Sequence, residues 1–325
     1  MSRKEISLSD IRAAWARIAP HIVPLHIAPS SSLSQHFGKD IMLAHEYLQT
    51  TGAFKLRGAM NSVLQLDAAT TGVTAVSTGN HGRALAYSAR QAGVPCIICM
   101  SELVPQNKLE AIRALGAETR IVGKSQDEAE IEARRLVAEE GFTMIPPFEH
   151  PHVIAGQGTL GLEMLEQLPD LDTVLVQLSG GGLISGIALA IKSQKPGVRV
   201  IGISMERGCA MYASQQAGKP VEVEELPTLA DSLGGGIGLD NRLTFDIVHD
   251  YVDELVLLSE DEIAEGIRYA YCREQVILEG GGAVGIAALL AGKVTPGDRT
   301  VVLLSGKNID MGLHRQIINR EEYRL

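Results

Sequence analysis

The sequence predicts an α/β fold of two units, each built from parallel strands and covering helices. Short β-branched or apolar runs alternate with segments of helical period along most of the chain. The length of 325 residues suits two units, at roughly 150 residues per domain. The third observation is the high glycine content. The 34 glycines are roughly one residue in ten, above the usual ~7%, and they suit tight strand-to-helix turns.

The elements of the first half follow this alternation. A first helix is expected after Ser7, where Ser7 and Asp10 resemble a capping box and Ile11, Trp15 and Ile18 follow at helical spacing. The next expected elements are strands at 73–77, 96–100 and 119–122 and helices at 81–93, 106–116 and 125–140. The last of these helices begins with a capping box formed by Ser125 and Glu128. Strands and helices in alternation indicate parallel β-α-β units.

A proline-rich segment at 146–151 interrupts the pattern, which then resumes. Strands are expected at 173–178, 198–204 and 300–304, and a helix after the glycines at 180–182. The sequence therefore predicts a small unit over 71–150. The larger unit combines both ends of the chain, 1–70 and 151–325.

The charge of the chain limits its partners. Net charge is −10, from 29 Lys and Arg against 39 Asp and Glu, and the cations form no cluster that could neutralise nucleic-acid phosphates. No apolar run approaches the ~18–20 residues that span a bilayer, and residues 1–5 lead into a helix rather than a signal sequence. We therefore expect a cytoplasmic protein that binds neither nucleic acid nor membrane.

Cys96 and Cys99 form a C-x-x-C pair, a spacing that occurs in redox and zinc sites. They lie in the apolar run 94–100, which is typical of a buried strand. Side chains three residues apart on a strand point to opposite faces, and no second pair completes a metal site. The pair is therefore expected to be part of a buried strand.

Three predicted strands end in small polar residues, where ligands bind in open parallel sheets. The loop 77–81 leads into a helix and is either an anion site or an ordinary capped turn. The loop 179–182 could hold a phosphate on backbone N–H groups. It could also belong to a dinucleotide site, because Gly186 and then Glu206 follow at nearly the usual spacing. Residues 305–308 follow the last strand.

Lys55 lies outside these strand ends, among apolar and small neighbours in the segment 49–59. A desolvated lysine has a lowered pKa and can bind a carbonyl compound covalently. Most single lysines are surface charges, so Lys55 taken alone decides nothing.

Taken together, five segments in this order resemble the fold-type II pyridoxal-phosphate enzymes of the threonine dehydratase and serine racemase family. They are 51–59, 77–82, 156–159, 179–182 and 305–308. Within the family, 204–208 and 229–236 most resemble the hydroxyectoine-utilisation dehydratases. The resemblance covers nearly the whole chain and implies a tryptophan-synthase-β-like fold, with two open, mostly parallel sheets flanked by helices. It implies pyridoxal 5′-phosphate as the cofactor.

The resemblance also implies residue roles. Lys55 would hold the cofactor covalently, and its freed amine would take the Cα proton of the substrate. Phe54 would pack near the cofactor ring, Asn80 would hydrogen-bond its hydroxyl, and Ser305 would meet its pyridine nitrogen. The phosphate would bind at Ser179, Gly180, Gly181, Gly182 and Leu183. The substrate carboxylate would bind at Ser77, Thr78, Asn80 and His81.

Two of these residues shape the expected reaction. Neutral Ser305, where many pyridoxal enzymes have an acid, makes the ring a weaker electron sink and favours prompt loss of a β-leaving group. Thr78 stands where serine racemases have a second acid–base group, which makes it a second catalytic candidate. We therefore expect an ammonia-lyase (dehydratase). Its substrate would be a hydroxy amino acid such as threonine, serine or a hydroxyectoine-derived hydroxy-diaminobutyrate, and its products a keto acid and ammonia.

Two other activities remain open, an amino-acid racemase on the same cofactor and a nicotinamide-dependent oxidoreductase. Serine racemases bind a divalent ion through carboxylates, but Ser204 and Ala210 stand at those positions here and Glu206 is offset. No metal site is therefore expected, with a shifted site at Glu206 as the alternative. The family implies that the protein is a homodimer and that it binds a small-molecule amino-acid substrate.

Overall fold

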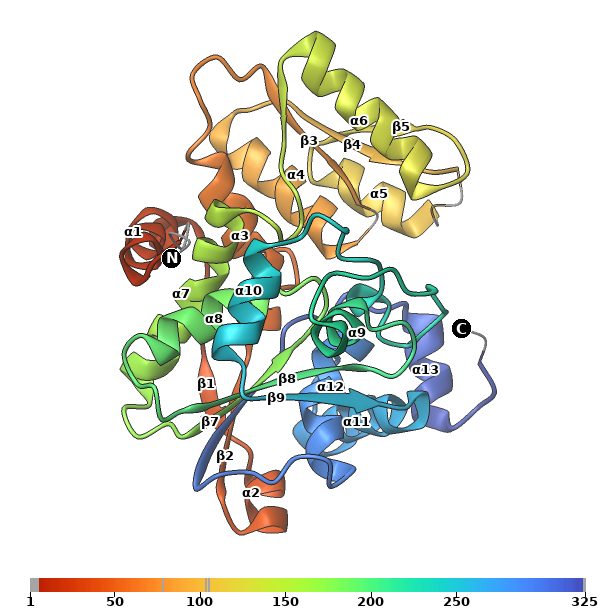
Figure 1. Cartoon of the computed structure of the whole chain (residues 1–325). Coiled ribbons are helices and arrows are strands. Elements are labelled where there is room, and N and C mark those ends of the chain that lie inside the picture. The colour runs from red at the N-terminus through yellow and green to blue at the C-terminus, as the bar shows by residue number, and fades with distance from the viewer. Residues whose placement is uncertain (1–5, 78, 103, 105, 324–325) are drawn as a thin grey trace.

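The computed structural model describes residues 6–77, 79–102, 104 and 106–323 of the chain. It consists of two α/β halves, one above the other in Figure 1, each built around its own sheet. The predicted class is confirmed, since both sheets are open, mostly parallel and flanked by helices. No helix among the described residues is long and apolar enough to cross a bilayer.

The larger sheet has six strands in the order β1-β2-β10-β7-β8-β9. They are β1 (Ile27–Pro29), β2 (Asp40–Ala44), β7 (Thr173–Gln177), β8 (Arg199–Met205), β9 (Glu254–Leu258) and β10 (Arg299–Leu303). Neighbours run parallel except β1 and β2, which pair antiparallel at one edge. Because β10 lies between β2 and β7, the two ends of the chain meet in one sheet, which we call the six-stranded half.

Helices cover both faces of this sheet (Figure 1). On one face α11 (Glu260–Glu274), α12 (Gly280–Leu290) and α13 (Met311–Asn319) share a core with Leu175 of β7. On the other, α7 (Pro151–Gln167) and α8 (Gly182–Lys192) pack on Val174 and Val176. The remaining helices here are α1 (Leu8–Ile18), η1 (Ala19–His21), α2 (Ser31–Phe37), η2 (Glu46–Leu48), α3 (Lys55–Val63), α9 (Ala210–Ala217), η3 (Asp231–Leu233) and α10 (Leu243–Tyr251).

The smaller sheet is wholly parallel, in the order β5-β4-β3-β6, and forms the four-stranded half. Its elements are β3 (Gly72–Val76), α4 (Asn80–Ala92), β4 (Cys96–Met100), α5 (Gln106–Ala114), β5 (Glu118–Ile121), α6 (Gln126–Glu140) and β6 (Phe142–Met144). Cys96 and Cys99 are buried in separate apolar clusters on β4. The interpretation of the C-x-x-C pair as part of a buried strand is therefore confirmed.

The predicted elements are all present, with ends that differ by a residue or two. Capping boxes begin α1 at Ser7 and α6 at Ser125, as the sequence suggested. Four strands, β1, β2, β6 and β9, were not predicted. Of these, β1 and β6 have only three residues each and none of them is fully buried, so hydrophobic periodicity gives no signal there.

A buried ion pair fixes α3, the helix that begins with Lys55. Arg57 is fully buried and pairs with Glu46 of η2 (Nε to Oε1, 2.7 Å) and with Glu163 of α7. At Gly156 of α7 a Cβ atom would lie 2.6 Å from the carbonyl oxygen of Arg57, so the two helices are in close contact. Breaking a buried ion pair typically costs about 3–5 kcal/mol, so this contact holds α3 firmly on the six-stranded half.

Candidate active site

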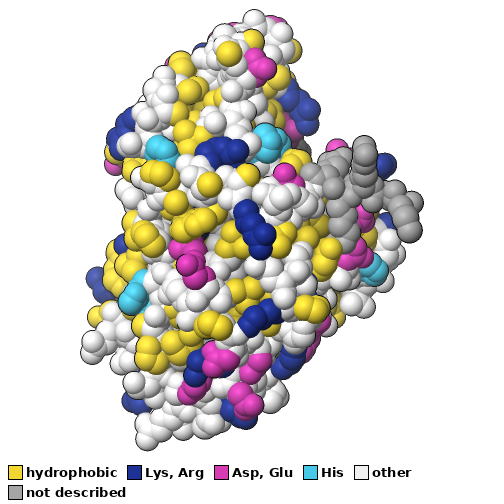
Figure 2. All heavy atoms as spheres, turned by 90° about the vertical axis from the view of Figure 1, so that its left-hand side faces the viewer, with side chains coloured by type: hydrophobic (Ala, Val, Ile, Leu, Met, Phe, Trp, Pro, Cys, Tyr) yellow, Lys and Arg dark blue, Asp and Glu magenta, His cyan; other side chains and the backbone are white. Residues whose placement is uncertain are grey.

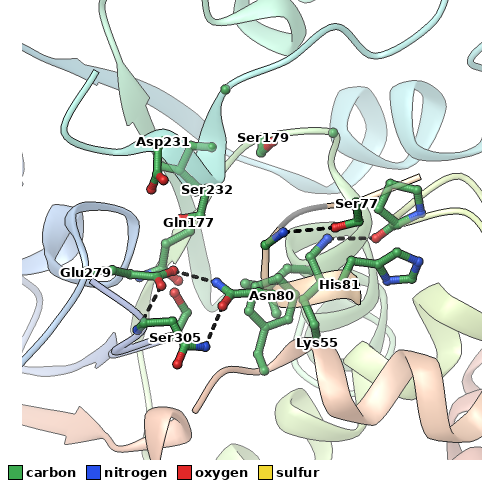
Figure 3. Close-up of a pocket in the computed structure, with 18 of the residues that line it drawn as sticks. Lys55, Ser77, Asn80, His81, Gln177, Ser179, Asp231, Ser232, Glu279 and Ser305 are labelled. Atoms are coloured by element: carbon green, nitrogen blue, oxygen red, sulfur yellow. Dashed lines mark hydrogen bonds between the residues drawn. The ribbon is translucent and has the colours of Figure 1, made fainter. Parts of the chain in front are cut away.

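A cavity of about 310 Å³ lies between the two halves, at the C-terminal ends of β3, β7 and β10 (Figure 3). It brings together every described residue that the sequence singled out for binding or catalysis. These are Phe54, Lys55, Ser77, Asn80, His81, Ser179, Gly180, Gly181, Gly182, Leu183 and Ser305. Thr78, the remaining candidate, lies outside the described residues.

Lys55 begins α3 and extends into this cavity. Its Nζ donates to the carbonyl oxygen of Pro147 at 2.8 Å and lies 5.2 Å from the ring centre of Phe54. Burial lowers the pKa of Lys55 to about 8, although the charge of Glu279 partly opposes the shift. A lysine with this pKa is neutral in an appreciable fraction of molecules near neutral pH, as a nucleophile or base requires.

The four-stranded half contributes the start of α4. Ser77 Oγ accepts the N–H groups of Gly79 (3.3 Å) and Gly82 (3.1 Å), which shapes the turn into the helix. The N–H groups of Asn80 and His81 are at the first helical positions and have no intrahelical acceptor, so they can bind an anion.

His81 is buried, and its Nε2 donates to the carbonyl oxygen of Ile145 at 2.7 Å. Burial and the charge of Lys55 lower its pKa to about 3. His81 is therefore neutral at physiological pH, with Nδ1 as its unprotonated nitrogen. It can orient a ligand but does not supply a positive charge.

The six-stranded half contributes the glycine loop before α8. The first N–H groups of α8 have no intrahelical partner. Gly181 has a φ of +89°, which side chains other than glycine rarely adopt. At Gly180 and Gly182 an added Cβ would overlap Phe148. The loop is thus confined to glycine and presents backbone donors, which is the chemistry that a phosphate needs.

Ser305 follows β10 and Gln177 ends β7, so both lie at the C-terminal edge of the larger sheet. Gln177 Nε2 donates to the carbonyl oxygen of Leu303 at 2.7 Å, and Gln177 Oε1 is buried with no hydrogen-bond partner among the described residues. Gln177 was not predicted. Its amide oxygen gives the cavity an acceptor that a ligand donor could satisfy.

Glu279 is the other important residue that sequence reasoning missed. It caps α12 and is only 4% exposed. Burial, together with the charge of Asp231, raises the pKa of Glu279 to about 7. The signal in the sequence was the run of glycines at 280–282, which begins a helix as the glycines at 180–182 do.

An ion pair between the halves stands at the edge of the cavity. Lys108 of α5 pairs with Asp231 of η3 at 3.1 Å, and both side chains line the cavity. Because one partner comes from each half, the pair links the two halves at the site.

The residues present fit a phosphorylated aldehyde such as pyridoxal 5′-phosphate. The glycine loop offers backbone donors for a phosphate, and Lys55 offers an amine with a lowered pKa for the aldehyde. The unsatisfied oxygen of Gln177 shows that the cavity wall has polar capacity that the protein itself does not use.

Glu206, the residue considered for a shifted cation site, pairs with Lys293 (3.3 Å). Among the residues that the structure describes, no group of three or more His, Cys, Asp or Glu side chains could hold a metal ion. The absence of a metal site stays a prediction.

Residues 18–306 match the family model described as pyridoxal-phosphate dependent enzyme. The matched range contains all the strands of both sheets, from β1 to β10, and Lys55. It therefore includes both surfaces of the cavity.

Relatives agree with the family model over nearly the whole chain. A Sinorhizobium fredii protein named provisionally as a threonine dehydratase is 56% identical over 317 residues, which cover 97% of this chain and 96% of the relative. An L-threonine ammonia-lyase of Thermotoga maritima is 42% identical, covering 97% of this chain and 79% of the relative. The structure of maize serine racemase superposes with a TM-score of 0.91 at 33% identity, covering 97% of both chains.

Proposed function

The chain belongs to the family of pyridoxal-phosphate-dependent enzymes, and we propose that it is an ammonia-lyase that eliminates water from a hydroxy amino acid. The products are a keto acid and ammonia. The observation that carries the proposal is the convergence of Lys55, the glycine loop 179–182 and the start of α4 in one cavity. A nicotinamide-dependent oxidoreductase has no support from any of the relatives described above.

When bound, the cofactor supplies an electron-withdrawing ring that stabilises negative charge at Cα of the substrate. The glycine loop would bind its phosphate, Phe54 would pack near the ring, and Ser305 would meet the pyridine nitrogen. Lys55 would hold the cofactor, and its neutral amine, once freed by the substrate, would take the Cα proton. The protonated amine would then give a proton to the departing hydroxyl, which would leave Cβ as water, and hydrolysis of the enamine product would give the keto acid and ammonia.

The substrate carboxylate binds at the start of α4. Free N–H groups of Asn80 and His81, the hydroxyl of Ser77 and the positive end of the helix dipole favour an anion there. The proposal includes Thr78 in this loop, as a carboxylate ligand and as a second acid–base group. Fixing the carboxylate orients the Cα–H bond toward Lys55.

For the finer identity of the substrate we propose a hydroxy amino acid with a further charged group, such as the hydroxy-diaminobutyrates related to hydroxyectoine. Asp231, Glu279 and Gln177 all line the cavity and have acceptor oxygens, of which Gln177 Oε1 has no partner among the described residues. A wall of acceptors and carboxylates favours a second ammonium group. Threonine itself would need only a small apolar niche for its methyl group.

The division of the chain is also a proposal. Residues 1–70 and 151–325 form a large cofactor-binding domain around the six-stranded sheet, and 71–150 form a small domain. We further propose that the protein acts as a cytoplasmic homodimer, as the family implies.

The test is release of ammonia and keto acid from a panel of hydroxy amino acids, with chiral analysis of the remaining substrate. The panel contains serine, threonine, 3-hydroxyaspartate and hydroxylated diaminobutyrates. Release from one member supports the lyase and identifies its substrate. Racemisation at Cα without release of ammonia would replace the lyase by a racemase. If no member of the panel is either deaminated or racemised, the proposal is overturned.

A further inference from the structure

Both carboxylate oxygens of Glu279 accept hydrogen bonds inside the cavity wall. Its Oε1 accepts one from Asn80 Nδ2 at 2.8 Å, and its Oε2 accepts one from the backbone N–H of Asn308 at 3.1 Å (Figure 3). A Cβ atom at Gly306 would lie 2.6 Å from Oε1, so the carboxylate packs directly against this glycine. Two N–H donors therefore favour the ionised form of Glu279, against the burial that opposes it.

These contacts also fix the orientation of the Asn80 side chain. Asn80 Oδ1 accepts from Asn308 Nδ2 at 2.6 Å while Asn80 Nδ2 donates to Glu279. The amide of Asn308 is itself oriented, because its Nδ2 also donates to the carbonyl oxygen of Thr51 at 2.9 Å. Turning the Asn80 amide over would place two oxygens together at Glu279 and two N–H groups together at Asn308.

The fixed orientation of the Asn80 amide has one consequence for a ligand. Of the two hydrogens on Asn80 Nδ2, one is used by Glu279 and one is left for a group in the cavity. Asn80 is on the four-stranded half, whereas Glu279 and Asn308 are on the six-stranded half. The hydrogen bonds among Glu279, Asn80 and Asn308, which we call the lock, therefore join the two halves at the cavity.

We propose that Glu279 is a positioning residue, which as a carboxylate holds Asn80 as a hydrogen-bond donor to the ring oxygen of the cofactor. The inference rests on the proposed function only in the identity of the cofactor. The charged groups that act on Glu279 are Lys55 of α3, Arg83 of α4 and Asp231 of η3.

Glutamine cannot replace Glu279 in this lock. A glutamine amide has one acceptor atom and one donor atom, but the site presents two N–H donors, and the backbone donor of Asn308 cannot turn over. Either orientation of the introduced amide would leave two N–H groups facing each other. Loss of one such buried bond weakens binding by about tenfold or more.

The experiment measures cofactor binding and the visible absorbance of the bound cofactor against pH, for the protein with Glu279→Gln, Asn80→Ala or both. We expect Glu279→Gln to raise the apparent Kd for pyridoxal 5′-phosphate and to shift the pH midpoint of the absorbance band. In the Asn80→Ala background the same change should have little further effect, because Glu279 acts through Asn80. Glu274→Gln is the matched control, since Glu274 accepts only rotatable hydroxyls of Ser30 and Ser32 and does not line the cavity.

Additive losses in the double variant, or an unchanged Kd and midpoint in Glu279→Gln, would overturn the inference. If Glu279→Gln does not fold, Asn80→Asp decides the question instead. Asn80→Asp places a second carboxylate beside Glu279, and the two repel each other when both are ionised. As the pH falls, a proton shared between them relieves this repulsion. Cofactor binding by Asn80→Asp should therefore improve relative to Asn80→Ala at lower pH. Equal binding by the two variants at every pH would contradict the lock. Because binding is measured without turnover, failure of the lyase assay is a separate result.

Discussion

The two halves of the molecule contribute to the site in different ways. The six-stranded half supplies a backbone surface, the loop 179–182 whose glycines are confined by Phe148, together with the side chains of Lys55 and Ser305. The four-stranded half supplies a side-chain surface, formed by Ser77, Asn80 and His81. The comparison teaches that the first surface should fail when atoms are added to it, and the second when atoms are removed.

Lys55, at the start of α3, lines the same cavity as both surfaces, and its loss should have the largest effect. We expect Lys55→Ala to reduce turnover by about 10³-fold or more, because it removes both the covalent anchor and the base. Lys55→Arg, which keeps charge and bulk, should be as inactive. Steady-state kinetics and borohydride trapping of the cofactor would check this, and full turnover by Lys55→Ala would refute the assigned role.

Adding one methyl group to the backbone surface gives the next largest effect. In Gly180→Ala the new Cβ overlaps the ring of Phe148, and overpacking of this kind costs about 1–3 kcal/mol, or roughly 5–150-fold in cofactor affinity. Adding Phe148→Ala should make room and restore much of the binding. Gly197→Ala is the control, because a Cβ there meets nothing within 4 Å. Equal cofactor affinities for Gly180→Ala and Gly197→Ala would break the comparison.

The depressed pKa of Lys55 predicts how the cofactor-free protein takes up pyridoxal 5′-phosphate. Only the neutral amine reacts, and with a pKa of about 8 its fraction rises roughly tenfold per pH unit up to pH 8 and then levels off. An ordinary lysine would continue to gain until its pKa of 10.5. Stopped-flow absorbance across pH 6–10 would distinguish the two profiles, and a rate still rising tenfold per unit at pH 9 would exclude the shift.

The smallest expected effect comes from removing one atom on the side-chain surface. Ser77→Ala deletes the hydroxyl that accepts two N–H groups at the turn into α4, a loss of about 1 kcal/mol. We expect KM for the amino acid to rise about fivefold. Ser88→Ala removes a hydroxyl within the same helix, away from the cavity, and should leave KM unchanged. Similar KM values for both variants would show that the turn does not depend on Ser77.

Much of the fold could be predicted because it depends on local sequence patterns. The capping boxes at Ser7 and Ser125, the apolar run 96–100 and the glycines at 180–182 each fall where the structure has a helix start, a strand or a turn. The opposite faces of Cys96 and Cys99 follow from the two-residue period of a strand. These features depend on neighbours within a few residues.

The sequence by itself determined the α/β class, six of the ten strands that the structure describes and the loops that line the cavity, since each depends on short-range periodicity and turn chemistry. Only the tertiary structure decided how Glu279, Asn308 and Asn80 meet, because they are up to 228 positions apart and nothing in their own segments marks them as partners. The same holds for the pKa of Lys55. Burial lowers this pKa and the charge of Glu279 partly opposes the shift, and both influences exist only when the two halves pack around the cavity.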